Sequence, residues 1–275
     1  MLSDPFYRVA DSEIIIPGVT GEHILMQISD LHLSVYDELS DAAEREKAEA
    51  CEANWMTLRE DFTRWHSEPF DDSKRIPSPK VLEKMLALAE KMRPEALLMT
   101  GDMLDFIGPA GARAMRAALE GYSGELIYLE GNHDVGTGGV RSAGAQVVRL
   151  DGFTVVGLNN GGLTVSDREL AELKALCAEG VPLIVAQHVP ALTEASRDKI
   201  AGFGEYFYID AASQDANAAE LVRVERDDPA VKAILCGHLH CFVRSEIAPG
   251  KPQLCASSAL CGFVHRITVK GTQEE

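Results

Sequence analysis

The chain has 275 residues, of which 46% are hydrophobic and 25% are charged, as in an ordinary globular protein. A net charge of −17 disfavours binding to extended nucleic acid, although metal ions in a site can still attract a small phosphate. The sequence contains no membrane-spanning run and no signal-peptide pattern, so we expect a cytoplasmic protein that does not bind membranes.

Short apolar runs predict buried strands at 23–29, 95–100, 125–130, 153–158, 182–187 and 231–236. Between them, a helix is expected over 78–94, with Ser78 as its cap, Pro79 in its first position and Pro94 at its end. Ser166 and Glu169 have the spacing of a capping box, which starts another helix that ends at Gly180.

Three shorter strand-like pieces follow, at 241–247, 253–259 and 263–269. The change from alternating strands and helices to consecutive strands indicates an α/β protein with mixed sheets. No repeat or linker interrupts the sequence, and we therefore predict one domain over residues 1–275.

The segment from Ser40 to His66 has apolar residues at alternating intervals of three and four, which is typical of one face of a long helix. These residues are Ala48, Cys51, Trp55, Leu58, Phe62 and Trp65. We interpret the segment as a helical insertion at about 37–76, after the first predicted strand, that packs along the domain surface. Two alternatives are a cap over the active site and a homodimer seam through Trp55 and Trp65.

The stretch "CGHLHC" at 236–241 resembles a local zinc clip, but such a clip would force the strand at 231–236 to fold back on itself. Cys236 is better explained as the last buried residue of that strand. We expect the six cysteines of the chain to be free thiols, since a cytosolic protein normally keeps its cysteines reduced.

Five of the predicted strands are followed directly by polar side chains that bind metals or transfer protons. They are Asp30 and His32; Asp102; Asn132, His133 and Asp134; His188; and His238 and His240. Each motif alone is an ordinary loop. Together they follow the carboxyl ends of strands, where open α/β sheets build their sites, and they indicate a metal centre.

This set of motifs resembles the calcineurin-like metallophosphoesterase superfamily over residues 24–240. The resemblance implies a four-layer αββα sandwich with two mixed β-sheets and two metal ions, Mn, Fe or Zn. One ion would bind Asp30, His32 and His240, the other would bind Asn132, His188 and His238, and Asp102 would bridge them. Asp105 is expected to support the ligands rather than bind metal.

In such a centre, a hydroxide that bridges the metals attacks phosphorus. His133 would protonate the leaving group, and Asp134 would orient the ring of His133. The substrate would be a small phosphomonoester or phosphodiester. A nucleotide is one candidate, because the motifs look most like the cyclic-nucleotide phosphodiesterase branch. The alternatives are a catalytically silent scaffold or protein-interaction module and a structural zinc module. The silent scaffold is disfavoured because all seven ligands and His133 are present.

Overall fold

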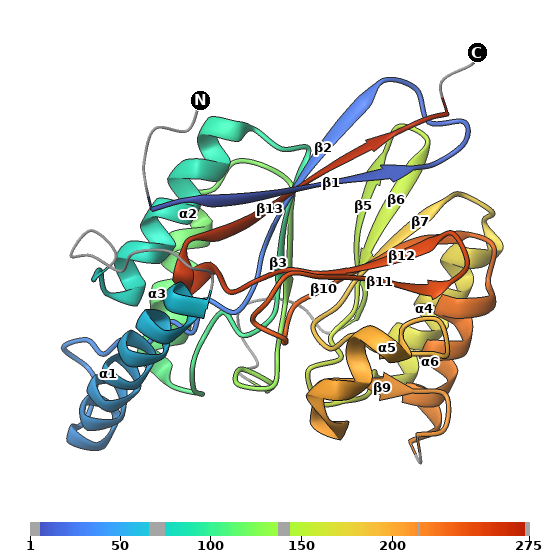
Figure 1. Ribbon diagram of the computed structural model, residues 1–275. Coiled ribbons are helices and arrows are strands. Elements are labelled where there is room, and N and C mark those ends of the chain that lie inside the picture. Colours follow the sequence, from blue (N-terminus) through green and yellow to red (C-terminus); the bar gives the residue numbers. More distant parts are fainter. Residues whose placement is uncertain (1–5, 66–74, 137–143, 214, 273–275) are drawn as a thin grey trace.

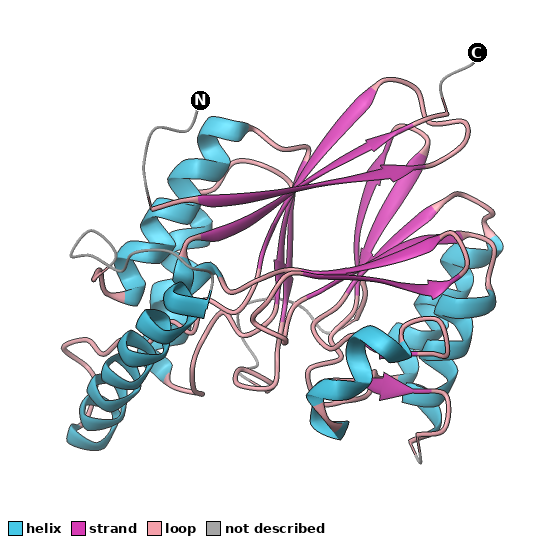
Figure 2. Cartoon of the chain, in the orientation of Figure 1, coloured by secondary structure: helices cyan, strands magenta, loops and turns pink. Residues whose placement is uncertain are grey.

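Two large mixed β-sheets form the centre of the protein, and helices cover their outer faces (Figures 1 and 2). The computed structural model describes residues 6–65, 75–136, 144–213 and 215–272. The first sheet has the order β1 (Arg8–Ile15), β13 (Phe263–Lys270), β2 (Glu22–Ile28), β3 (Ala96–Thr100) and β4 (Leu126–Leu129). The second has the order β11 (Val243–Ala248), β12 (Lys251–Cys255), β10 (Val231–Cys236), β7 (Leu183–Ala186), β6 (Phe153–Gly157) and β5 (Gln146–Leu150).

Among the described residues, six α-helices flank the sheets or connect their strands. They are α1 (Ala42–Trp65), α2 (Ser78–Met92), α3 (Pro109–Glu120), α4 (Asp167–Ala178), α5 (Arg197–Ile200) and α6 (Ala216–Asp227). Short 3₁₀ turns lie at η2 (Ala201–Phe203), η3 (Glu205–Phe207) and η4 (Ala259–Cys261), and the short strands β8 (Ala191–Leu192) and β9 (Ile209–Asp210) pair with each other. None of the helices in the described ranges combines the length and the hydropathy that a membrane crossing requires.

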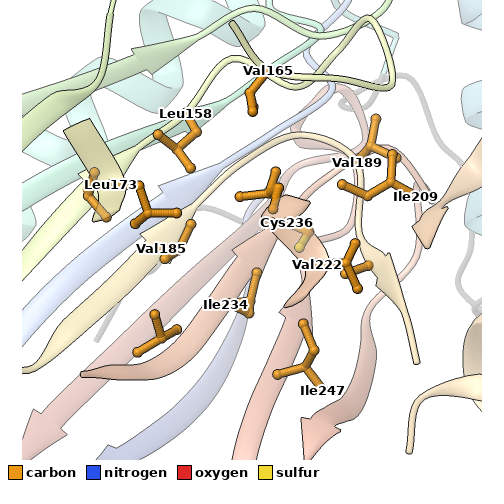
Figure 3. Close-up of a cluster of buried hydrophobic side chains, with 14 of the residues drawn as sticks. Leu158, Val165, Leu173, Val185, Val189, Ile209, Val222, Ile234, Cys236 and Ile247 are labelled. Carbon is orange, nitrogen blue, oxygen red and sulfur yellow. The ribbon is translucent and has the colours of Figure 1, made fainter. Parts of the chain in front are cut away.

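The alternation of side chains along the strands produces the layers, because successive residues of a strand point to opposite faces. In β3, Leu97 and Met99 pack outward with residues of α2 and α3, while Leu98 packs inward between the sheets. In β10, Ile234 packs outward against the α4 and α6 side, and Leu235 packs inward. Figure 3 shows the outer cluster on that side. The predicted αββα sandwich is therefore confirmed.

The parallel strands place several carboxyl ends at the same edge of the molecule. β2, β3 and β4 run parallel to one another in the first sheet, and β6, β7, β10 and β12 do so in the second. A bridge between Ser29, directly after β2, and Ser258, after β12, joins the two sheets at this edge. The loops that follow the strand ends can therefore meet in one place.

Two details of the sequence interpretation are wrong. Ser78 does not cap α2: the cap position is Pro77, and the Ser78 hydroxyl donates instead to Glu52 of α1 at 2.6 Å. The strand before α1 is the second of the chain, because β1 precedes it. β1 is an edge strand in which the polar residues 11–13 interrupt the apolar pattern. The capping box of Ser166 and Glu169 at the start of α4 is confirmed.

Helix α1 contacts the body of the protein through part of its predicted apolar face. Ala48 and Trp55 are buried, whereas Cys51 and Leu58 are half-buried. The side chains of Phe62 and Trp65, as well as residues 66–74, lie outside the described part of the chain. All six cysteines are free thiols.

A buried carboxyl group in α6 forms no ion pair within the described residues. Glu225 is fully buried, and neither of its carboxyl oxygens accepts a hydrogen bond within the described residues. Burial raises the pKa of Glu225 to about 8, although the ammonium group of Lys251 lowers it. Oε1 of Gln187, which is close to this carboxyl, also has no donor among the described residues, so a proton on Glu225 would satisfy both groups.

Glu225→Gln is therefore expected to stabilise the protein at pH 8 by about 2–5 kcal/mol and to have little effect at pH 4.5. The folded state holds this proton more tightly than the unfolded state, so the wild-type protein loses stability as pH rises from about 4.5 to 8. Urea denaturation at several pH values measures this difference. Glu220→Gln, which changes a half-buried carboxylate of α6 that pairs with Lys174, is the control. Equal pH slopes for Glu225→Gln and wild type would contradict the assignment.

Candidate metal centre

The residues that follow the strand ends have an unusual backbone conformation. Among the described residues other than glycine, seven have positive φ, and five of these are Asp30 (φ 56°), His32 (φ 51°), Asp102 (φ 51°), His238 (φ 71°) and His240 (φ 53°). Such a conformation is unfavourable for residues with a side chain and concentrates at functional sites. The fold therefore accepts backbone strain in order to direct these side chains toward a common point.

Glycines in the same motifs make room for side chains from other strands. A Cβ atom on Gly101 would overlap the ring of His188, and one on Gly131 would overlap the carboxylate of Asp102. A Cβ atom on Gly237 would overlap Ser29 and approach Asp30. The glycine before each of these motifs is thus explained by close packing between loops that are far apart in sequence.

The first group of side chains joins the loops after β2, β3 and β10. Asp30, His32, Asp102 and His240 offer ligand atoms that all lie within 4.8 Å of one another. Nε2 of His240 lies 3.2 Å from Oδ1 of Asp30 and 3.1 Å from Nε2 of His32. Asp30, His32 and Asp102 are buried, and His240 is half-buried. Carboxylate oxygens and imidazole nitrogens in this arrangement are suitable ligands for a transition-metal ion.

The second group surrounds the other side of Asp102. Nε2 of His188 lies 3.3 Å from Oδ2 of Asp102, 3.1 Å from Oδ1 of Asn132 and 3.1 Å from Nδ1 of His238. Asp102, His188 and His238 again form a group whose ligand atoms lie within 4.8 Å of one another. Asp102 thus belongs to both groups, which is the position required of a bridging ligand.

Three of the imidazole rings are oriented by an oxygen atom on the side away from the two groups. Nδ1 of His188 donates to the carbonyl oxygen of Thr100 at 2.8 Å, and Nε2 of His238 donates to that of Tyr206 at 2.9 Å. Nδ1 of His32 lies 3.1 Å from the carboxylate of Asp105. Each contact fixes one ring nitrogen on the outer side and directs the other ring nitrogen toward the two groups, which is the orientation that histidines that bind metals require.

The two groups shift the pKa values of their members. Burial alone would raise the pKa of Asp102, but the nearby His188 lowers it well below its usual range. Burial by itself would lower the pKa of His188. The charge of Asp102 and its hydrogen bond to His188 outweigh this effect and raise the pKa to about 9. The paired anionic and imidazole groups therefore attract and hold positive charge at this edge of the sandwich.

His133 lies beside the two groups with its ring toward the adjacent pocket. Its Nδ1 lies 2.9 Å from the carbonyl oxygen and 3.3 Å from the carboxylate of Asp105. The hydrogen bond to Asp105 raises the pKa of His133 to about 9, against the effect of burial. The ring is 37% exposed, so it remains accessible from solvent.

The expected orienting role of Asp134 is corrected by these contacts. The Asp134 carboxylate is fully buried and accepts hydrogen bonds from the backbone N–H groups of Met103, Leu104 and Gly131. It therefore organises the loops after β3 and β4 and does not contact the ring of His133. Asp105 takes the role that was expected of Asp134.

Trp55 of α1 was not recognised as a site residue from the sequence. Its indole stacks on the ring of His32 with 3.8 Å between ring centroids, and its Nε1 donates to Oδ1 of Asp105 at 2.6 Å. Asp105 thus holds His32, His133 and Trp55 at once. The apolar periodicity of α1 indicated only that Trp55 is buried, because spacing cannot show which residues the helix contacts.

Asp105→Asn is expected to lower activity by about 10–100-fold, the usual effect of losing a group that supports metal ligands. Asparagine keeps the size of the side chain but removes the charge that His32 and His133 share. Steady-state kinetics and metal content measure the effect. Asp151→Asn, which changes an exposed carboxylate that accepts from Thr20, is the control, and a variant with unchanged kinetics would contradict this role.

A cavity of about 760 Å³ opens next to the two groups. Its polar lining consists of Asp102, Asn132, His133, His238 and His240. Its apolar lining comes mainly from Trp55, Leu58, Leu163, Phe203, Tyr206 and Phe207. A substrate in this cavity would reach both the candidate metal ligands and a large apolar surface.

The two histidines of "CGHLHC" belong to different groups. His240 lies with Asp30 and His32, whereas His238 lies with His188. Cys236 is the buried last residue of β10, and none of the metal-compatible groups among the described residues contains a cysteine. The stretch is thus part of a site assembled from several strands.

Comparison with known proteins agrees with this geometry. The profile of the calcineurin-like phosphoesterase family matches residues 24–242. No curated protein matches the chain. Among solved structures, a dimetal phosphatase from Danio rerio is similar with a TM-score of 0.55 and 12% identity, over 86% of this chain and 88% of that one. A purple acid phosphatase from yellow lupin, Lupinus luteus, has a TM-score of 0.46 and 11% identity, over 92% of this chain and 45% of that one. At 12% identity, the similarity to the dimetal phosphatase establishes the fold alone.

Proposed function

Because the chain belongs to the calcineurin-like phosphoesterase family, we propose that it hydrolyses a phosphomonoester or phosphodiester at two metal ions. Asp30, His32 and His240 would hold one ion, Asn132, His188 and His238 would hold the other, and Asp102 would bind both. The observation that carries the proposal is the place of Asp102 in both groups of ligand atoms. Metal-dependent phosphoester hydrolysis is the general activity of this family. The roles of the individual residues are proposed here for this chain.

The donor set fits two divalent ions. The seven residues offer two carboxylates, four imidazoles and one amide, a set that suits Mn, Fe or Zn. Two pairs of imidazole nitrogens face each other at 3.1 Å, His32 with His240 and His188 with His238. A metal ion beside each pair would remove the repulsion between the nitrogen lone pairs, which otherwise requires a shared proton. Two divalent ions would also outweigh the two carboxylates and would attract a phosphate into an otherwise acidic protein.

When bound, two such ions supply Lewis acidity, orient the phosphate oxygens and lower the pKa of a water molecule that attacks phosphorus. The chain itself contributes the proton for the leaving group. Nδ1 of His133 is engaged by Asp105, so Nε2 is the atom that can donate a proton within the cavity. The raised pKa of His133 keeps the ring protonated at neutral pH, as a general acid requires.

The test is metal analysis together with a turnover screen in added Mn²⁺. The screen compares chromogenic phosphomonoesters, phosphodiesters and cyclic nucleotides, and it also decides between monoesterase and diesterase activity. Hydrolysis that disappears with a chelator and returns with Mn²⁺ would support the proposal. A protein with two tightly bound metal ions and no turnover of any class would instead be a silent scaffold. Metal bound only through Cys236 and Cys241 would indicate a structural zinc module.

A further inference from the structure

The cavity has an aromatic wall whose parts come from two distant segments. Trp55 and Leu58 of α1 line it on one side, and Phe203, Tyr206 and Phe207 of η2 and η3 also line it. Figure 1 shows α1 and α5, the helix directly before η2, on opposite sides of the lower part of the molecule. The cavity therefore extends from the proposed metal ligands to aromatic side chains on separate elements.

The rings of the 203–207 segment are exposed although they are large and apolar. Tyr206 is 80% exposed, Phe203 is 37% exposed and Phe207 is 38% exposed. Three such residues within five positions lose the free energy that burial in the core would provide. Exposed aromatic side chains that gather beside a cavity are typical of binding surfaces.

This segment is attached to the candidate metal centre. The carbonyl oxygen of Tyr206 accepts a hydrogen bond from Nε2 of His238 at 2.9 Å. The rings of Phe207 and His238 lie 5.1 Å apart, and those of Phe203 and Phe207 lie 6.4 Å apart. The aromatic wall is thus held at a set position relative to the place where a phosphate would bind.

The charges in the cavity restrict what binds against this wall. Among the described residues that line it, none is lysine or arginine, and Asp102 is the only carboxylate. A second or third phosphate on the substrate would therefore lack a cationic partner there. A neutral and flat group, by contrast, gains apolar and ring-stacking contacts with Phe203, Tyr206 and Phe207.

We infer that the substrate is an ester of a single phosphate whose alcohol carries an aromatic ring, and that Phe203, Tyr206 and Phe207 bind this ring. The inference rests on the proposed phosphoesterase function, since it places the phosphate at the metal ions. A nucleobase and an aryl group share the required chemistry. A cavity of about 760 Å³ is within the range that holds a group of nucleoside size.

The test uses pairs of substrates with similar alkoxide leaving groups. Adenosine 5′-monophosphate is compared with ribose 5-phosphate, and benzyl phosphate is compared with ethyl phosphate. The methyl diesters of the same alcohols are included, so that a pure diesterase is also tested. We expect the ring-bearing member to have a kcat/KM about tenfold higher in at least one pair. Preference in the first pair indicates a nucleobase, and preference in the second indicates an aryl group.

Substitutions in the aromatic wall then show which residues cause the preference for the ring-bearing substrate. Phe203→Ala combined with Tyr206→Ala should reduce the ratio of kcat/KM within the preferred pair by about tenfold. Tyr206→Phe keeps the ring and should retain the ratio. Tyr122→Ala, which changes an aromatic residue in a separate hollow beside Arg93, is the matched control and should also retain it.

A binding measurement separates failure of this inference from failure of the proposed function. Calorimetry with the Mn²⁺-loaded protein compares phenylphosphonate with methylphosphonate, neither of which requires hydrolysis. Tighter binding of phenylphosphonate that is lost in the double variant supports the aromatic site even if no ester is hydrolysed. Equal binding of the two phosphonates, or turnover without a ring preference, would overturn the inference whether or not the protein is a phosphoesterase.

Discussion

His133→Ala is expected to lower kcat by about 10²–10⁴-fold, which is the usual effect of losing a general acid. The variant should still bind two metal ions per chain. The ring of His133 lines the cavity, and its contacts with the Asp105 carboxylate and carbonyl leave Nε2 as the proton donor. It lies outside the two groups that contain Asp102. Steady-state kinetics and elemental analysis of the purified variant measure the two parts of the prediction.

The leaving group makes the test of His133 sharper. A 4-nitrophenolate leaves without protonation, whereas an alkoxide does not, so His133→Ala should slow alkyl esters far more than 4-nitrophenyl esters. His23→Ala is the matched control, because His23 bonds to Glu95 and Thr20 and does not line the cavity. Loss of a metal ion from His133→Ala, or an equal effect on both esters, would contradict the role of general acid.

Asp102→Asn is expected to remove at least one metal ion and to lower kcat by about 10³-fold or more, because a metal centre contributes several kcal/mol to such reactions. The substitution preserves size but removes the negative charge that lies between His32 and His188. The backbone N–H of His133 donates a hydrogen bond to Oδ1 of Asp102 at 2.8 Å. The amide oxygen of asparagine can still accept this bond, so the loop after β4 should keep its position. The expected loss therefore reflects the missing bridge rather than unfolding.

A graded comparison tests whether Asp102 is shared by two metal sites. Asn132→Ala should weaken only the site with His188 and His238, so it should lower activity less than Asp102→Asn. Metal titrations should show one weakened site for Asn132→Ala and two for Asp102→Asn, and thermal unfolding checks the fold. Full metal content and near-normal turnover in Asp102→Asn would refute the shared ligand.

Much of the fold could be predicted because its determinants are local. The predicted strands at 95–100 and 231–236 are mainly apolar. In the structure β3 (Ala96–Thr100) is buried throughout, and β10 is buried except for the half-buried Lys232. β1 does not follow this rule, because half of the residues in its sequence, "RVADSEII", are polar and it is an edge strand. Apolar periodicity predicts a buried element, and it fails where the sheet leaves a strand half in solvent.

The gathering of the candidate ligands also follows from the sequence, since parallel strands bring their carboxyl ends to one edge. Asp30, Asp102 and His188 each come directly after such a strand, and the structure places them together. Which acidic residue orients His133 was decided only by the tertiary structure. Asp134 directly follows His133, whereas Asp105 lies 28 residues before it. Loop packing nevertheless directs Asp134 to backbone N–H groups and Asp105 to the ring, which sequence distance cannot show.

The sequence by itself determined the residue types at the strand ends, and with them the family and the chemistry of the centre. The tertiary structure alone decided what surrounds that centre: Trp55 on the ring of His32, and the aromatic residues 203–207 beside His238. These contacts join segments separated by long stretches of chain, and their distances depend on how helices and loops pack against the sheets. No local pattern encodes such packing, which is why the reaction class could be inferred from the sequence and the wall of the cavity could not.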